Sequence, residues 1–107
     1  MEKMSSPENS EKDLRSKAVE ALKNNAEGAK ELFLEWRLLR EAEVEILGKE
    51  KGAIRLLIES ADIFAEAGMI GEAMENLYDA HIYASQMHDT ELISEIERKT
   101  GDIENGA

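Results

Sequence analysis

The sequence predicts an all-α fold of four to five antiparallel helices. Helix-forming residues dominate the composition, and a single proline among 107 residues leaves long helices uninterrupted. A small, a large and a third core residue recur 44 positions apart, as Ala29, Phe33 and Trp36 and then as Ala73, Leu77 and Ala80. Residues at i, i+4 and i+7 share one helix face, so each copy marks a packed helix. Such a repeated unit predicts stacked helical hairpins, which usually hold another protein.

The N-terminal part supplies two of the expected helices. Residues 1–9 are polar and predicted to be disordered, and a first helix is expected over 10–23 with Ser10 as its N-cap. A second helix is expected over 29–47. Its core face is assigned to Ala29, Leu32, Phe33, Trp36, Leu39, Ile46 and Leu47. Leu34 and Leu38 point away from that face, which predicts a second neighbour or a subunit contact.

The helix expected over 53–67 follows a turn assigned to the glycine-bounded segment 48–52. It is apolar around most of its circumference. Its polar residues fall at i, i+4, i+7 and i+11 and form one narrow strip, namely Arg55, Glu59, Asp62 and Glu66. So wide an apolar arc exceeds what one neighbour can cover, which predicts that this helix is the central and most buried one.

Two more helices are expected in the C-terminal part, over 72–87 and 90–100. Asp89 is expected to cap the last helix and Gly101 to end it. Residues 102–107 are expected to form a frayed tail, so the folded domain is assigned to residues 10–101.

The helix over 72–87 has large apolar residues on two sides. Tyr83 and Met87 follow the spacing of the small alanines and are assigned to the core. Tyr78 and Ile82 lie on the opposite side and are surface candidates.

The segment 60–89, SADIFAEAGMIGEAMENLYDAHIYASQMHD, resembles a tetratricopeptide (TPR) helical hairpin. Leu57, Ala61 and Phe64 match core positions of its first helix, Gly68 matches the turn, and Ala73, Leu77 and Ala80 match the second helix. The TPR-like resemblance covers about residues 29–100 and implies TPR-like stacking. The 44-residue spacing leaves HEAT-like pairing and a plain helical bundle as alternatives.

Charge limits the classes of partner. The formal net charge is −11, and residues 53–107 carry −9 of it, with twelve acids and three bases. Nucleic acids and anionic membranes are disfavoured partners, because both are bound through Lys and Arg. The chain has no cysteine, no apolar run of membrane-spanning length and no apolar segment near its start that resembles a secretory signal. These features predict a cytoplasmic protein.

No pattern in the chain indicates a chemical reaction. His81 and His88, with Asp89, could form part of a metal site, but no third ligand at suitable spacing accompanies them. The acids of the strip lack the spacing of a calcium loop. No nucleotide-binding or nucleophile motif is present. We therefore expect no catalytic residues, no metal site and no cofactor, and an enzyme or metal-dependent regulator is the least favoured function.

The expected function is a non-enzymatic protein–protein interaction module of TPR-like type, one component of a larger assembly. The TPR-like resemblance implies a partner surface lined by the first helix of each pair, which here comprises Arg55, Ile58, Asp62, Ala65 and Glu66. The acids of that surface favour a basic segment of the partner. Because clustered acids repel one another, replacing Glu66 with Lys is expected to leave folding intact or slightly improved.

A self-associating structural domain is the alternative function. In this alternative, Leu34 and Leu38 mediate a homodimer and no peptide ligand is bound. A two-fold symmetric dimer is the commonest arrangement that buries such a patch.

Overall fold

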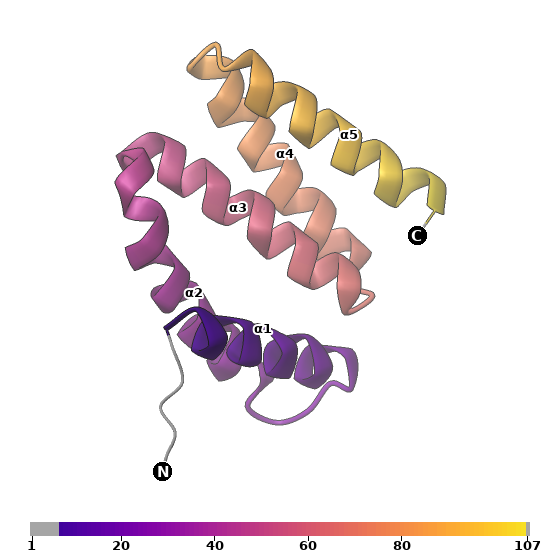
Figure 1. Cartoon of the computed structure of the whole chain (residues 1–107). Helices are drawn as coiled ribbons and strands as arrows, with labels where there is room; N and C mark the ends of the chain where they lie inside the picture. Colours follow the sequence, from indigo (N-terminus) through magenta and orange to yellow (C-terminus); the bar gives the residue numbers. More distant parts are fainter. Residues whose placement is uncertain (1–6, 107) are drawn as a thin grey trace.

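The computed structural model describes residues 7–106, and this part of the chain is all-helical (Figure 1). Its elements are α1 (Pro7–Lys23), α2 (Ala29–Val44), a short 3₁₀ helix η1 (Glu45–Leu47), α3 (Lys49–Glu66), α4 (Ile70–Gln86) and α5 (Thr90–Gly106). The predicted all-α class and the five helices are confirmed. The disorder expected for residues 1–6 lies outside the described residues, and residues 7–9 belong to α1.

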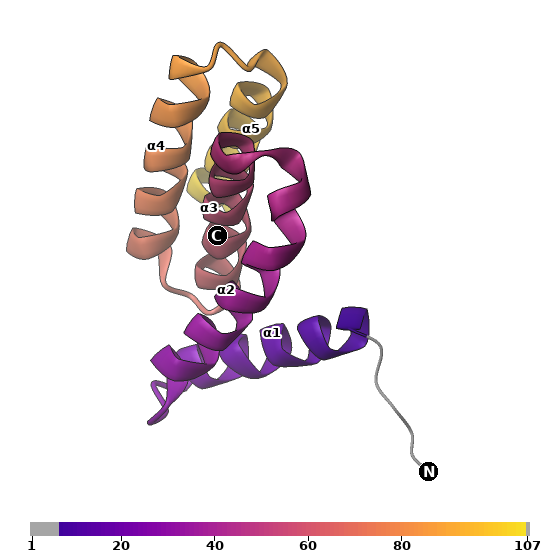
Figure 2. The same cartoon turned by 90° about the vertical axis from the view of Figure 1, so that its left-hand side faces the viewer.

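The helices form two groups that share α3. Helices α3, α4 and α5 run antiparallel and side by side, whereas α1 lies across the end of this group (Figures 1 and 2). The expected antiparallel arrangement therefore holds for the last three helices and not for α1. Trp36 of α2 stands where the echo in α4 has Ala80, and it fills the space between α1, α2 and α3.

The core consists of two clusters on opposite faces of α3. Ile54, Ile58 and Ala61 of α3 pack with the buried residues of α4 and α5, Ala73, Leu77, Ala80, Ala84, Leu92 and Ile96. Leu56 and Ile63 of α3 pack with Trp36, against Leu14, Val19, Leu22 and Phe33. We call these the C-terminal and N-terminal clusters. The prediction that this helix is central is confirmed, and its wide apolar arc is explained by two separate sets of neighbours.

The boundary between α2 and α3 differs from the expected turn at 48–52. Only Gly48, whose φ is 97°, lies between η1 and α3, and Gly52 is inside α3. A Cβ atom at Gly52 would lie 2.8 Å from the Val44 carbonyl oxygen. Glycine thus allows α3 to pass directly against the end of α2, so this glycine serves close packing rather than a turn.

Both ends of the expected domain are also longer in the structure. Helix α1 begins at Pro7, so Ser10 lies within the helix and is not its N-cap. Helix α5 continues through Gly101 to Gly106, where a frayed tail was expected. Ile103 packs against the C-terminal cluster and extends the buried stripe of Leu92 and Ile96 by two turns, which explains the extension. The predicted cap is confirmed, because the Leu92 N–H donates to Asp89 Oδ1 at 3.1 Å.

Four large side chains assigned to the core are exposed instead. Tyr83 is exposed because the buried stripe of α4 runs through Ala80 and Ala84, and Tyr83 lies beside that stripe. Met87 is exposed because α4 ends at Gln86. Ile46 and Leu47 are exposed because α2 ends at Val44, and the 3₁₀ turn no longer keeps them on its core face. The assignment of Tyr78 and Ile82 to the surface is confirmed.

Candidate interaction surfaces

The structure divides the five residues predicted to bind a partner between the core and a set of ion pairs. Ile58 is fully buried in the C-terminal cluster, and Ala65 is half-buried against that cluster. A partner cannot reach Ile58 without unfolding α3, so this part of the predicted surface is wrong. The other three, Arg55, Asp62 and Glu66, are each paired with a residue of another helix.

The polar strip of α3 is joined to three other helices by charged hydrogen bonds. Arg55 donates to Glu95 of α5 at 2.8 and 2.9 Å, and Lys99 of α5 donates to Asp62 at 3.1 Å. Arg40 of α2 donates to Glu59 at 2.7 and 2.8 Å, and Arg15 of α1 donates to Glu66 at 3.0 and 2.6 Å. Three of these four pairs are of the two-bond arginine–carboxylate kind, which fixes orientation as well as charge. The strip thus holds the helices together.

These pairs change the electrostatics of the strip. The hydrogen bond from Arg15 lowers the pKa of Glu66, and the hydrogen bond from Arg55 lowers the pKa of Glu95. Each acid of the strip is matched by a base of another helix, so the strip is not the free acidic surface that the sequence indicated. Free acids and exposed apolar side chains gather on two other surfaces.

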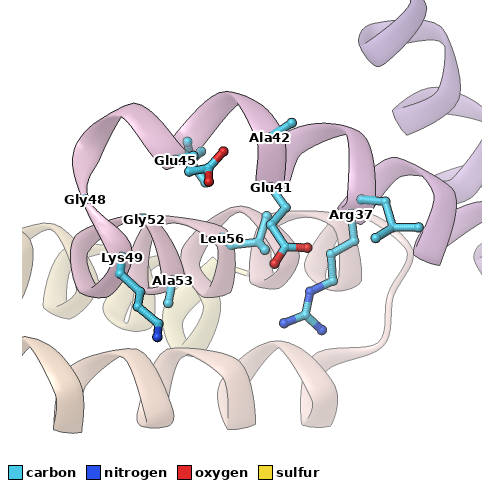
Figure 3. A pocket seen from close by; sticks show the side chains of 11 residues that line it. Arg37, Glu41, Ala42, Glu45, Gly48, Lys49, Gly52, Ala53 and Leu56 are labelled. Atoms are coloured by element: carbon cyan, nitrogen blue, oxygen red, sulfur yellow. The ribbon is translucent and has the colours of Figure 1, made fainter.

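The first is a groove between the C-terminal half of α2 and the N-terminal half of α3, with a volume of about 770 Å³ (Figure 3). Its apolar lining comprises Leu38, Ala42, Val44, Gly48, Gly52, Ala53 and Leu56, and its charged lining comprises Arg37, Glu41, Glu45 and Lys49. Figure 3 shows Arg37 and Lys49 at opposite ends, with Ala53 and Leu56 between them. We call this the α2–α3 groove.

An exposed apolar ridge borders the α2–α3 groove. Leu34, Leu38 and Ala42 are spaced four residues apart on α2 and are all exposed, Leu38 by 68%. Ile46, at the next four-residue step in η1, is 89% exposed. The prediction that Leu34 and Leu38 face away from the core is confirmed. No described part of the chain covers them.

The second surface is the exposed side of α4, which we call the α4 outer face; its Tyr78 also lines a groove between α4 and α5. Its exposed residues are Glu72, Glu75, Tyr78, Asp79, Ile82, Tyr83 and Gln86, with Met87 at the helix end. Tyr78 is 69% exposed, and α4 contains no Lys or Arg. Over residues 70–106 the chain carries nine acids and two bases. The sequence analysis correctly assigned Tyr78 and Ile82 to the surface, but it wrongly assigned Tyr83 and Met87 to the core.

His81 lies in the one arrangement that resembles catalytic chemistry among the described residues. Its Nδ1 is 3.4 Å from Ser85 Oγ, and its Nε2 is 3.3 Å from Glu97 Oε2 of α5. Both separations exceed those of an activated nucleophile and its base. Ser85 sits within α4, whose backbone N–H groups are used inside the helix and cannot stabilise an oxyanion. The arrangement links α4 to α5.

His88, the other candidate metal ligand, is exposed in the turn after α4, with a φ of 56°. Among the side chains that the structure describes, no three His, Asp or Glu residues are grouped closely enough to hold a metal ion. The same residues include no helix with the length and apolar character required to span a bilayer.

Comparisons with protein-family models, with curated proteins and with solved structures found no match to this chain.

Proposed function

We propose that this chain is a non-enzymatic protein–protein interaction module of TPR-like type, a component of a larger assembly, and that its acidic α4 outer face binds a basic segment of another protein. The single observation that carries the proposal is the composition of that face. Three acids, Glu72, Glu75 and Asp79, lie beside half-exposed Tyr, Ile and Met side chains, with no base on the helix.

The chemistry of the face defines the partner. Tyrosine and methionine are enriched in protein interfaces, where they supply large contact areas. On the helix surface, Tyr78 and Ile82 flank one side of the line of acids, and Tyr83 and Met87 flank the other. A helix or extended segment with apolar residues between Lys or Arg residues matches both properties. The excess of acids over residues 70–106 would also attract a basic segment before contact.

The polar strip of α3 takes no part in this proposal, because its charges are already paired. The proposal of TPR-like stacking is supported by the antiparallel α3–α4 hairpin and by the small residues Ala73 and Ala80 at the contact between these two helices. Helix α3 serves as the scaffold that presents α4, since both core clusters pack against it.

Selection from a random peptide display library tests this function. Wild-type protein should enrich peptides that combine Lys or Arg with apolar residues, and added salt should weaken their binding. The variant Glu75→Lys/Asp79→Lys should bind such a peptide at least about tenfold more weakly, since like charges then oppose it. The matched control Glu20→Lys/Glu27→Lys makes the same charge change at exposed positions in α1 and the following loop and should retain binding.

Two outcomes would contradict the proposal. Enrichment of acidic peptides would overturn the electrostatic part. Basic peptides that bind the α4 variant and the wild type equally would show that another surface holds them. Circular dichroism of each variant should confirm that the helices remain folded.

A further inference from the structure

The α2–α3 groove and its apolar ridge are distinct from the α4 outer face, and their charges differ. Residues 29–53, which include α2, η1 and the start of α3, carry five bases and six acids, a formal charge of −1. The remainder of the chain therefore carries −10 of the total −11. Residues 1–28 also carry −1, and residues 54–107 carry the remaining −9. Two copies of this chain therefore repel each other most strongly through their C-terminal helices, and α2 lies outside that part of the chain.

We propose that the α2–α3 groove is the contact surface for a second copy of this chain, with Leu38 of each copy inserted into the groove of the other. The inference is independent of the proposed function. In this dimer, the ridge of α2 in one copy inserts into the α2–α3 groove of the other copy.

The shape of the surface is self-complementary. Leu34 and Leu38 project from α2, whereas Ala42, Gly52 and Ala53 line the adjoining groove with small side chains or none. Ridges with four-residue spacing pack into one another in the commonest class of helix contact. In an antiparallel pairing of two α2 helices, Leu38 of each copy contacts Ala42 of the other, and Leu34 extends toward the partner's Ile46. Such reciprocal contacts are what two-fold symmetry requires.

The charges along the ridge are also self-complementary. Arg37, Glu41 and Glu45 follow each other at four-residue spacing along one flank of the ridge, and all line the groove. Two-fold symmetry places this flank beside its own copy in the reverse direction. Arg37 of one copy then lies next to Glu41 and Glu45 of the other, and the same pairing occurs twice. Arg37 forms no ion pair with any other described residue within one molecule, so it is available for this contact.

A basic peptide is a poorer occupant of the groove than a second copy. The charged lining contains two bases and two acids, so it offers no net attraction to a partner of one sign. The α4 outer face, by contrast, would repel a second copy because it carries acids alone.

Sedimentation equilibrium of the full chain, from micromolar to several hundred micromolar, tests the inference. The wild type should show a concentration-dependent monomer–dimer equilibrium. Leu38→Glu should weaken dimerisation at least about tenfold, because it buries a charge in the groove. The matched control Tyr78→Glu places the same charge at an equally exposed position on α4 and should leave the dimerisation constant unchanged.

Charge reversal provides a second measurement that does not depend on apolar packing. Arg37→Glu alone and Glu41→Arg/Glu45→Arg alone should each be monomeric, because like charges then face each other. An equimolar mixture of the two variants should restore dimers, since the introduced glutamate of one variant then faces the two introduced arginines of the other.

Two results would overturn the inference. One is a wild type that stays monomeric at the highest concentration, and the other is a dimer that Leu38→Glu leaves intact. Neither result bears on peptide binding by the α4 outer face. The dimer proposal and the proposed function can therefore be rejected independently.

Discussion

Arg15 of α1 donates two hydrogen bonds to the carboxylate of Glu66 in the last turn of α3, with N–O distances of 3.0 and 2.6 Å. The two residues are 51 positions apart in the chain. Because α1 lies across the end of the α3–α5 group, this pair ties the least parallel helix to the central one (Figure 2). Glu66 therefore has a structural role, contrary to the expectation that it belongs to a free acidic surface.

Replacing Glu66 with Lys should destabilise the fold rather than leave it unchanged. The substitution removes both hydrogen bonds and places a positive charge against Arg15. Solvent screens this pair because Glu66 is half exposed, so the expected loss is about 1 kcal/mol, a decrease of a few degrees in Tm. Thermal unfolding followed by circular dichroism measures it. Glu66→Gln should cost less, and the exchange Arg15→Glu/Glu66→Arg should recover part of the loss. An unchanged Tm for Glu66→Lys would show that the pair contributes nothing.

Two glycines inside helices should respond oppositely to alanine. At Gly52, the new Cβ would meet the Val44 carbonyl oxygen at 2.8 Å, and overpacking of this kind costs about 1–3 kcal/mol. At Gly101, the Cβ would meet nothing within 4 Å, so better helix propensity should stabilise by about 0.5–1 kcal/mol. Urea unfolding of the two variants measures both effects. Equal effects would mean that α2 and α3 do not approach as closely as the structure shows.

The comparison of these glycines shows where prediction from the sequence succeeds. Helix existence and the central position of α3 followed from apolar spacing within one helix, which is a local property. The boundaries at Gly52 and Gly101 were wrong because glycine signals a turn locally, whereas close packing against Val44 and burial of Ile103 decided the outcome. Those are contacts between helices, and the sequence does not display them.

The expectation of a free acidic strip on α3 was wrong for the same reason. Spacing placed Arg55, Glu59, Asp62 and Glu66 in one strip, which is correct, but their partners lie 19 to 51 residues away in the chain. A strip of charges on a central helix has the same sequence pattern whether it faces solvent or other helices. Arg15 and Arg40 were identifiable in the sequence as possible partners for the acids of the strip. Which acid each arginine meets, however, depends on how the helices pack.

Acid should weaken the fold through Glu66 and Glu95. Hydrogen bonds from Arg15 and Arg55 hold the pKa of these carboxyls below the ordinary value of 4.5. Their stabilising contribution is therefore complete above that value and is lost as the pH falls through the lower pKa of the folded state. Tm measured against pH should decrease below about pH 4.5, the ordinary glutamate pKa.

The double variant Glu66→Gln/Glu95→Gln is the control for this pH dependence. It should have a lower Tm than the wild type at neutral pH, and the difference should shrink as the pH falls. A Tm difference that stays constant down to about pH 3 would show that the two carboxyls do not titrate differently in the folded and unfolded states.

Trp36 offers a test of whether the two core clusters unfold together. It is the only tryptophan of the chain and is 1% exposed in the N-terminal cluster, so its fluorescence reports on α1, α2 and α3. Ile96 belongs to the C-terminal cluster, and Ile96→Ala should cost about 2–5 kcal/mol through lost burial and a cavity. Because both clusters pack on α3, this remote change should lower the midpoint of the Trp36 transition together with that of the circular dichroism signal.

The half-buried Ile103, at the end of the same stripe, provides a matched control. Ile103→Ala should lower both midpoints by a smaller amount, since less apolar surface is removed from water on folding. A fluorescence midpoint that stays at its wild-type value in Ile96→Ala, while the dichroism signal splits into two steps, would show independent units. Helix α3 would then not couple the two clusters, and a change near α4 would leave the α2 surface unaffected.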